Sequence, residues 1–224
     1  IKNDMEKIIP LQRLLQGDVG SGKTIIAILA IIKTMSNGYQ GILMAPTEIL
    51  AEQHYLKLNM MLSKLGFKIS LLIGSINNKK RDEIRKDIAD NKINLIIGTH
   101  ALFQEDINYH KVGLIVIDEQ HRFGVEQRHK LKNKGNNTDL LVMTATPIPR
   151  TLALTLYGDL DLSIIDELPP GRSPVITTWR KDNARSKIYK FVKDKIKEGR
   201  QAYIVCPLIE PSDDVNAKSA SEVF

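Results

Sequence analysis

The sequence contains a single cysteine, Cys206, within the apolar run AYIVCPLI. No disulfide can form within the chain, which suits a reducing compartment, and a buried structural thiol is the expected state of Cys206. The longest apolar run, Ile25 to Ile32, is too short to cross a bilayer and ends at Lys33. The sequence opens with no signal peptide and has no internal repeats or low-complexity tracts. We therefore expect a cytoplasmic protein with no membrane partner.

The charge of the chain has one prevailing sign. The 224 residues carry a formal net charge of +6, with 42% hydrophobic and 26% charged residues. This length suffices for one sizeable domain, or for one domain plus part of a second. The positive charge fits a polyanionic partner such as nucleic acid, and it fits a lysine-rich protein without such a partner equally well.

Short apolar runs alternate with helical stretches along most of the chain. Strands are predicted at 41–46, 67–74, 93–98, 112–118 and 140–146, and helices at 47–66, 77–91 and 149–158. Gly66 and Pro149 are typical of a helix end and a helix start. Because the strands are nearly continuous apolar runs, they favour an open, mostly parallel α/β sheet with helices on both faces.

A domain boundary is predicted at ELPPGRSP, residues 167–174, where three prolines and a glycine interrupt regular structure. We expect a first domain over 1–168, a linker over 169–175, and the beginning of a second α/β domain over 176–224. In that second part the pattern predicts a strand at 175–180, a helix at 183–199 and a strand at 201–208. The second domain would then be incomplete.

The segment GDVGSGKT, residues 17–24, matches the phosphate-loop pattern G-x-x-x-x-G-K-[ST]. A predicted strand precedes it and an apolar helix follows, so backbone N–H groups and the helix N-terminus would surround an anion. Glycines permit the close approach and unusual dihedral angles of such a loop. Lys23 would reach the β- and γ-phosphates of ATP, and the Thr24 hydroxyl would bind Mg²⁺. The predicted nucleotide-binding residues are Gly17, Asp18, Val19, Gly20, Ser21, Gly22, Lys23 and Thr24.

An acidic pair follows the apolar strand GLIVID, at the strand end where sites of open α/β sheets lie. Asp118 would hold Mg²⁺ and Glu119 would orient and deprotonate the attacking water. Taken alone, such a pair would fit a helix N-cap or a solvated turn. Thr144 and Thr146, in TAT after the next predicted strand, have hydroxyls that could bond the acidic pair and couple its state to a bound polymer.

Five segments occur in the order of the superfamily 2 helicase motifs, namely GDVGSGKT, APTEILAEQH, GTHAL, DEQH and TATPIPRT. With HRFGVEQR and LYGDLDLSIIDELPPGR, they resemble the RecG family of bacterial ATP-dependent DNA helicases over nearly the whole chain. The transcription-repair coupling factors are the nearest alternative. Their acidic box usually reads DEEH, and a tyrosine usually precedes the last Gly-Lys of their phosphate loop. Gln120 and Ser21 therefore favour RecG.

The resemblance implies a RecA-like P-loop NTPase fold that uses ATP and Mg²⁺ and acts on forked or branched DNA, as a monomer when complete. It implies catalytic roles for Lys23, Asp118, Glu119, Gln120 and His121. It implies contacts to the DNA backbone from Thr47, Thr99, His100 and Arg122. Arg128, Lys130, Lys132 and Lys134 are weaker candidates, since a solvated basic helix explains their charges equally well. Phe123 and Arg150 are further candidates for contacts to DNA or to the opposite domain.

Three functions stay open on this basis. The first is a motor that remodels stalled replication forks and branched DNA in recombination and repair. The second is a transcription-repair coupling translocase, and the third is a nucleotide-binding module without motor activity. Because the second motor domain normally supplies arginine fingers, we expect this chain to bind ATP but to hydrolyse it slowly.

Overall fold

The computed structural model describes residues 1–103, 107–119, 138–146, 160–167, 175–206 and 221. The chain divides into two compact units, Ile1–Arg172 and Ser173–Phe224. The division falls inside the segment 169–175, where the sequence suggests a linker. Within the described residues, no helix has both the length and the apolar character that crossing a membrane requires.

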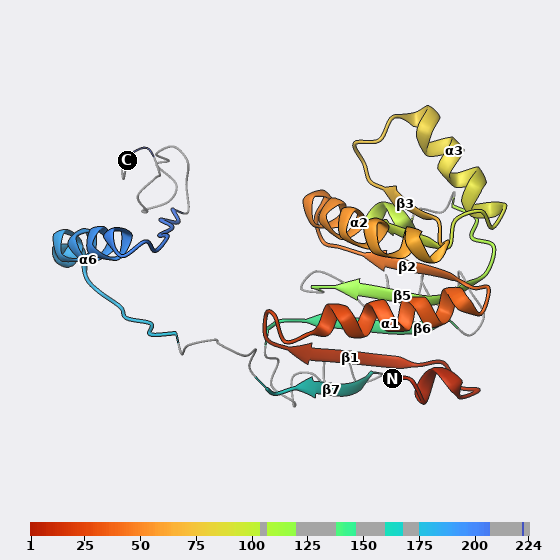
Figure 1. The fold of residues 1–224 in the computed structure, drawn as a ribbon, viewed down its shortest axis with the longest axis horizontal. Helices are drawn as coiled ribbons and strands as arrows, with labels where there is room; N and C mark the ends of the chain where they lie inside the picture. The colour runs from red at the N-terminus through yellow and green to blue at the C-terminus, as the bar shows by residue number, and fades with distance from the viewer. Residues whose placement is uncertain (104–106, 120–137, 147–159, 168–174, 207–220, 222–224) are drawn as a thin grey trace. The chain divides into compact units, whose positions relative to one another are not determined.

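The first unit is built on a seven-stranded parallel sheet (Figure 1). In chain order the strands are β1 (Gln12–Gly17), β2 (Gln40–Met44), β3 (Ile69–Leu72), β4 (Leu95–Gly98), β5 (Val112–Asp118), β6 (Asp139–Thr144) and β7 (Asp161–Ile165). They lie in the order β3-β4-β2-β5-β6-β1-β7, and all neighbours pair in parallel. All strands therefore end at the same edge of the sheet.

Three helices, α1 (Lys23–Ser36), α2 (Glu48–Leu62) and α3 (Asn78–Ala89), connect the first four strands. Side chains before α2 and α3 cap them: Thr47 Oγ1 accepts the Leu50 N–H and Asn77 Oδ1 accepts the Lys80 N–H. After α2, the 3-10 turn η2 (Ser63–Leu65) ends at Gly66, whose φ is +84°. The predicted helix end at Gly66 is confirmed. Two more 3-10 turns are η1 (Asp4–Glu6) and η3 (His100–Phe103).

The central strands are buried on both faces, because successive side chains of a strand point to opposite sides. In β5, Ile115 and Ile117 belong to a core that includes Ile88 of α3. Leu114 and Val116 belong to a second core, which α1 and α2 cover. Figure 1 shows α1 and α2 on the near side of the sheet. The predicted α/β fold, with helices on both faces of a parallel sheet, is confirmed.

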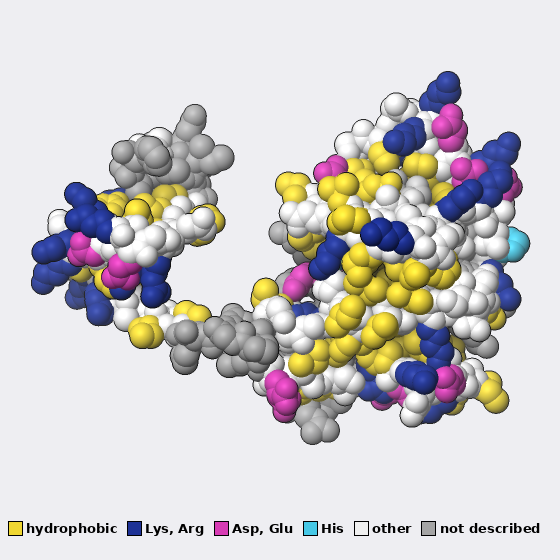
Figure 2. Space-filling view, viewed as in Figure 1, with side chains coloured by type: hydrophobic (Ala, Val, Ile, Leu, Met, Phe, Trp, Pro, Cys, Tyr) yellow, Lys and Arg dark blue, Asp and Glu magenta, His cyan; other side chains and the backbone are white. Residues whose placement is uncertain are grey.

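Apolar side chains also lie on the outer surfaces of α1 and α2. Figure 2 shows hydrophobic atoms gathered over these two helices on the face in view. Among the exposed residues are Ile25 and Leu29 of α1 and Ile49, Leu56 and Met60 of α2. The sequence of α1 is apolar on nearly all sides, but the sheet buries only one side of it.

The sequence does not predict β7, which pairs with β1 at the edge of the sheet. Its polar residues interrupt the apolar run, and they bond a charged residue of β1. Arg13 donates to Ser163 Oγ at 2.9 Å and to Asp161 Oδ2 at 3.2 Å. An edge strand held partly by polar contacts lacks the continuous apolar signal of the central strands.

The described part of the second unit contains the turn η4 (Asp182–Ala184) and the helix α6 (Arg185–Lys197). This confirms the helix predicted over 183–199. The predicted strands are wrong where the structure describes them, since 175–180 and 201–206 form no strand. A strand requires a hydrogen-bonded neighbour, and here Ile176 and Val205 are 88% and 90% exposed. Cys206 is half-buried rather than buried.

A buried glutamine joins three segments at the amino-terminal edge of the sheet. Gln40 is 0% exposed. Its Nε2 donates to the carbonyl oxygens of Ile88 and Ile93, at 2.9 and 3.0 Å, and its Oε1 accepts the His110 N–H at 2.9 Å. One side chain thereby holds the end of α3, the start of β4 and the approach to β5.

Replacing Gln40 with leucine is expected to lower the free energy of unfolding by about 3 kcal/mol or more, because buried carbonyl and N–H groups lose their partners. Urea unfolding followed by circular dichroism measures this change. Gln53→Leu, at an exposed position of α2, is the matched control and should change stability by less than about 0.5 kcal/mol. Equal stabilities of the two variants would contradict this account of Gln40.

Candidate active site

The segment 17–24 joins the end of β1 to the start of α1. Gly20 and Gly22 have φ angles of +81° and +98°, which side-chain-bearing residues rarely adopt. A Cβ atom on Gly17 would meet Ser21 Oγ at 2.6 Å and Ile165 Cβ at 3.0 Å. The loop therefore folds back closely on itself and on β7, and a side chain at position 17 would force these neighbours to shift. The first turn of α1 receives no side-chain cap from Gly22, so backbone N–H groups there are available to an anion.

The ammonium group of Lys23 lies inside this loop, and the residue is 8% exposed. Lys23 Nζ donates to the carbonyl oxygens of Gly17 and Asp18, at 2.6 and 2.8 Å. In the described part of the chain, no carboxylate lies within ion-pair distance of it. Ser21 Oγ is also buried without a hydrogen-bond partner there. A buried cation needs a negative partner, so the loop is chemically suited to an anionic group.

The acidic pair lies at the end of β5. Glu119 has a φ of +52°, in the left-handed region, and two backbone contacts to the neighbouring β6 segment hold it. Its N–H donates to the Met143 carbonyl at 3.1 Å, and its Oε1 accepts the Ala145 N–H at 3.2 Å. Thr144 Oγ1 lies 2.9 Å from Thr146 Oγ1. The observed contact between the acidic pair and the TAT segment thus runs through the Ala145 backbone, and the two threonine hydroxyls bond each other.

Sheet order brings the loop and the acidic pair together, because β6 lies between β1 and β5. The three strands end in register: Gln16 pairs with Thr144, and Met143 pairs with Asp118. Neighbouring strands lie about 4.8 Å apart, so the ends of β1 and β5 are about 10 Å apart. A lysine side chain and a carboxylate at these positions can reach the same small ligand.

A residue that sequence reasoning missed contacts the acidic pair from the other side. His54 of α2 places Nε2 at 2.8 Å from Asp118 Oδ2, and the two side chains are 14% and 17% exposed. The motif APTEILAEQH contains His54, but the sequence carries no sign that this histidine meets an aspartate 64 positions later. Only the neighbouring positions of β2 and β5 in the sheet bring them together.

The DEAD/DEAH box helicase family matches residues 5–155 of the chain. The chain belongs to this family. It is 49% identical over 224 residues to the ATP-dependent DNA helicase RecG of Bacillus subtilis, covering 100% of this chain and 33% of that protein. With RecG of Thermotoga maritima the identity is 50%, covering 100% of this chain and 29% of that protein.

The solved structures agree with this membership. A structure of RecG bound to a three-way DNA junction matches with a TM-score of 0.77 and 46% identity, over 93% of this chain and 28% of that one. The DNA-bound helicase MrfA matches with a TM-score of 0.66 at 20% identity, over 89% of this chain and 32% of that one, which shows the fold alone. The resemblance to RecG inferred from the motifs is confirmed. The chain spans about a third or less of the length of these RecG relatives.

Further predicted residues of this DEAD/DEAH-family chain lie at the same edge of the sheet. Thr47 is exposed and follows β2, and His100 is exposed and follows β4. Thr99 is 3% exposed, so its side chain does not reach the surface in this structure. Gln120, His121, Arg122, Phe123, Arg128, Lys130, Lys132, Lys134, Pro149 and Arg150 lie outside the described residues.

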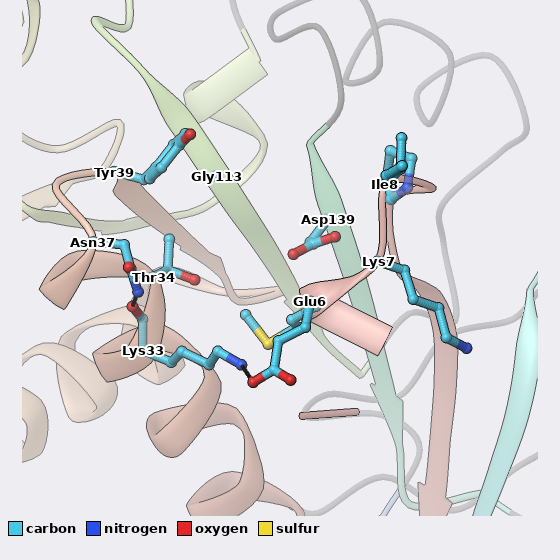
Figure 3. A pocket seen from close by; sticks show the side chains of 11 residues that line it. Glu6, Lys7, Ile8, Lys33, Thr34, Asn37, Tyr39, Gly113 and Asp139 are labelled. Atoms are coloured by element: carbon cyan, nitrogen blue, oxygen red, sulfur yellow. Dashed lines mark hydrogen bonds and ion pairs between the residues drawn. The ribbon is translucent and has the colours of Figure 1, made fainter. Parts of the chain in front are cut away.

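A pocket of about 410 Å³ lies at the opposite edge of the sheet (Figure 3). Its lining includes Lys33 from the far end of α1 and Gly113 and Asp139 from the starts of β5 and β6. Lys33 pairs with Glu6 at 2.6 Å. Asp139 Oδ1 accepts the Leu11 N–H at 2.7 Å, and burial raises the pKa of its carboxyl group. No predicted site residue lines this pocket, so we do not assign it to the active site.

Asp139→Asn is expected to increase stability more at pH 7 than at pH 4. Because the pKa of Asp139 is raised, the native state binds the proton of this carboxyl group more tightly than the unfolded chain does. The stability that this bound proton contributes is lost as the pH rises above 3.8, the ordinary pKa of an aspartate. Asparagine keeps an oxygen for the Leu11 N–H and carries no charge to desolvate. Urea unfolding midpoints across this pH range measure the difference.

The control for this experiment is Asp166→Asn, which removes an exposed carboxylate. Its pH profile should follow that of the unmodified chain. If the Asp139→Asn profile ran parallel to both, burial of the Asp139 carboxyl would not be a source of pH dependence.

Proposed function

We propose that this chain is the ATP-binding part of a DNA helicase of the RecG kind, in which ATP hydrolysis drives motion on duplex DNA and remodels forked or branched DNA. The observation that carries the proposal is the convergence of Lys23, Asp118 and Glu119 at one edge of the sheet. Chemistry on a nucleoside triphosphate requires a cation for the phosphates, an acid for the metal and a group that orients water. Because the RecG relatives are longer than this chain, the helicase activity of a whole protein is proposed here along with the role of the chain itself.

In this proposal the phosphate loop binds the β- and γ-phosphates of ATP. The Lys23 ammonium, which among the described residues bonds two backbone carbonyls, turns to the phosphate oxygens. The N–H groups of the first turn of α1 donate to the same oxygens. Both interactions are made by groups already fixed in the loop, so little ordering accompanies binding.

The donor set also fits Mg²⁺. The described residues contain no group of three His, Cys, Asp or Glu side chains that could hold a metal. Mg²⁺ usually takes one or two protein oxygens, with phosphate and water completing the shell. Thr24 Oγ1 in the first turn of α1 and the Asp118 carboxylate supply such oxygens. When bound, Mg²⁺ neutralises charge on the β- and γ-phosphates.

Glu119 is the proposed general base. The left-handed backbone of Glu119 and the hydrogen bond that its Oε1 accepts from the Ala145 N–H orient the side chain toward β6. Glu119 directly follows Asp118, the proposed metal ligand, and contacts the TAT segment. A change in either segment would therefore move this carboxylate, which supports the coupling role proposed for Thr144 and Thr146. Gln120 and His121 stay predictions drawn from the resemblance.

DNA is the proposed polymer partner. A structure of RecG, 46% identical to this chain, has a three-way DNA junction bound, and the net charge of +6 is compatible with a polyanionic partner. Thr47 and His100 are exposed at the edge that carries the nucleotide site, and we propose that they contact phosphates. Contacts from Thr99 and Arg122 stay predictions.

Lys23→Ala is expected to weaken ATP binding by about 10- to 100-fold, because a buried charged hydrogen-bond donor to the phosphates is lost. Calorimetric titration of the 224-residue chain with ATP and Mg²⁺ measures the affinity. Lys33→Ala, on the same helix, removes an ammonium at the far end and should keep the affinity within about twofold. Equal affinities of the two variants would contradict the phosphate site.

Glu119→Gln is expected to keep ATP affinity and to slow hydrolysis by about 10²- to 10⁴-fold, the usual contribution of a general base. Single-turnover hydrolysis by the full-length protein, with three-way junction DNA present, measures the rate. An unchanged rate would indicate a nucleotide-binding module in place of a motor.

A further inference from the structure

The contact between His54 and Asp118 has no role in the function proposed so far. Asp118 ends β5, and His54 lies near the middle of α2. Their polar atoms are 2.8 Å apart, and both side chains are more than four-fifths buried. Asp118 in its proposed role as a metal acid is a carboxylate, which only accepts hydrogen bonds, so in this role the hydrogen is assigned to Nε2 and His54 donates to Asp118 Oδ2.

Both partners stand on rigid elements. His54 lies three positions after Ala51 and four before Leu58, so all three share one face of α2. Ala51 and Leu58 are 0% exposed, which fixes this face against the sheet. Asp118 is held by its backbone, which pairs with β6 at Met143. The bond therefore joins two fixed points, and rotation of the Asp118 carboxylate would break it.

The hydrogen bond to His54 uses one lone pair of the Asp118 carboxylate. Oδ2 accepts the His54 N–H, which leaves Oδ1 and the second lone pair of Oδ2 for a metal ion or its water. Hydrogen bonds to a ligating carboxylate set its orientation, and their loss typically costs 10- to 100-fold in metal affinity or activity. A free carboxylate would instead rotate among several orientations, only some of which face the phosphate loop.

We propose that His54 is a positioning residue, which holds the Asp118 carboxylate in the orientation that binds Mg²⁺ with the nucleotide. This inference rests on the proposed function, because it takes Asp118 as the metal acid. In this role His54 acts through its hydrogen bond to Asp118, without itself binding the nucleotide or the metal. A histidine that merely anchored α2 would affect stability and leave metal dependence unchanged.

The experiment measures binding of a fluorescent ADP to the 224-residue chain, in EDTA and across a Mg²⁺ titration. His54→Ala is expected to raise the Mg²⁺ concentration for half-maximal binding about 10- to 100-fold. Affinity in EDTA should stay within about twofold of the unmodified chain, since the phosphate loop is intact. His54→Gln should restore most of the Mg²⁺ response, because the glutamine amide can place an N–H near the position of Nε2.

A double-mutant cycle separates positioning from anchoring. Once Asp118→Asn has removed the metal acid, adding His54→Ala should cause no further loss of Mg²⁺ response. His110→Ala is the matched control, because His110 is an exposed histidine before β5, at the opposite edge of the sheet. Thermal unfolding of each variant shows whether it folds. If His54→Ala does not, His54→Leu, which fills the space but has no N–H to donate, is tested in its place and should raise the required Mg²⁺ concentration in the same way.

Two results would overturn the proposal while the nucleotide function stands. One is a His54→Ala variant with an unchanged Mg²⁺ response. The other is an equal loss of affinity with and without Mg²⁺, which would indicate a damaged loop. If the unmodified chain bound the nucleotide equally in EDTA and in Mg²⁺, the metal role of Asp118 would fail, and the role of His54 with it.

Discussion

The in-register pairing of β1, β6 and β5 is the constraint on which the site depends. Residues near position 20 and position 118 are far apart in the chain, and only the backbone ladder brings them to one edge. Because Gln16 pairs with Thr144 and Met143 with Asp118, the three strand ends stand at the same level. A shift of one residue in either pairing would turn side chains to the other face of the sheet. The chemistry at this edge therefore depends on packing of the apolar strands behind it.

The buried ammonium of Lys23 shows how the fold prepares this edge for an anion. Desolvating a cation is costly, and two backbone carbonyls compensate for it only in part. Glu119 adds backbone strain in the left-handed region, at a cost of order 1 kcal/mol for a non-glycine residue, whereas Gly22 adopts its positive φ without such strain. A ligand that supplies negative charge would relieve the first cost and stabilise the unit by mass action.

The sequence predicted those elements whose structure depends on residues close together in the chain. The bounds of β5 match the predicted 112–118, since both faces of that strand are buried and its apolar run is continuous. Gly66 ends its helix through a φ of +84°, which glycine favours. The sequence failed where the cause lies elsewhere in the chain. The strand over 175–180 needs a partner, and β7 is held partly by Arg13 of another strand.

The site divides in the same way. The phosphate loop is contiguous, so its glycines and Lys23 could be recognised from spacing. His54 could not, because a histidine on a helix face meets Asp118 only after β2 and β5 become neighbours. For Thr99, the motif suggests a contact with the DNA backbone, whereas the fold buries its side chain. A motif identifies residue types that chemistry requires, whereas exposure and second contacts follow from the assembled sheet.

Polar side chains at the two edges of the sheet differ in how they are hydrogen-bonded. At the amino-terminal edge, Gln40 forms hydrogen bonds with three segments and Asp139 accepts the Leu11 N–H, so these two side chains are paired within the protein. At the carboxyl edge, Ser21 Oγ is buried without a partner among the described residues. Unpaired buried groups are tolerated where a ligand completes them. The buried, unpaired Ser21 hydroxyl and the left-handed Glu119 thus lie at the edge proposed for the nucleotide.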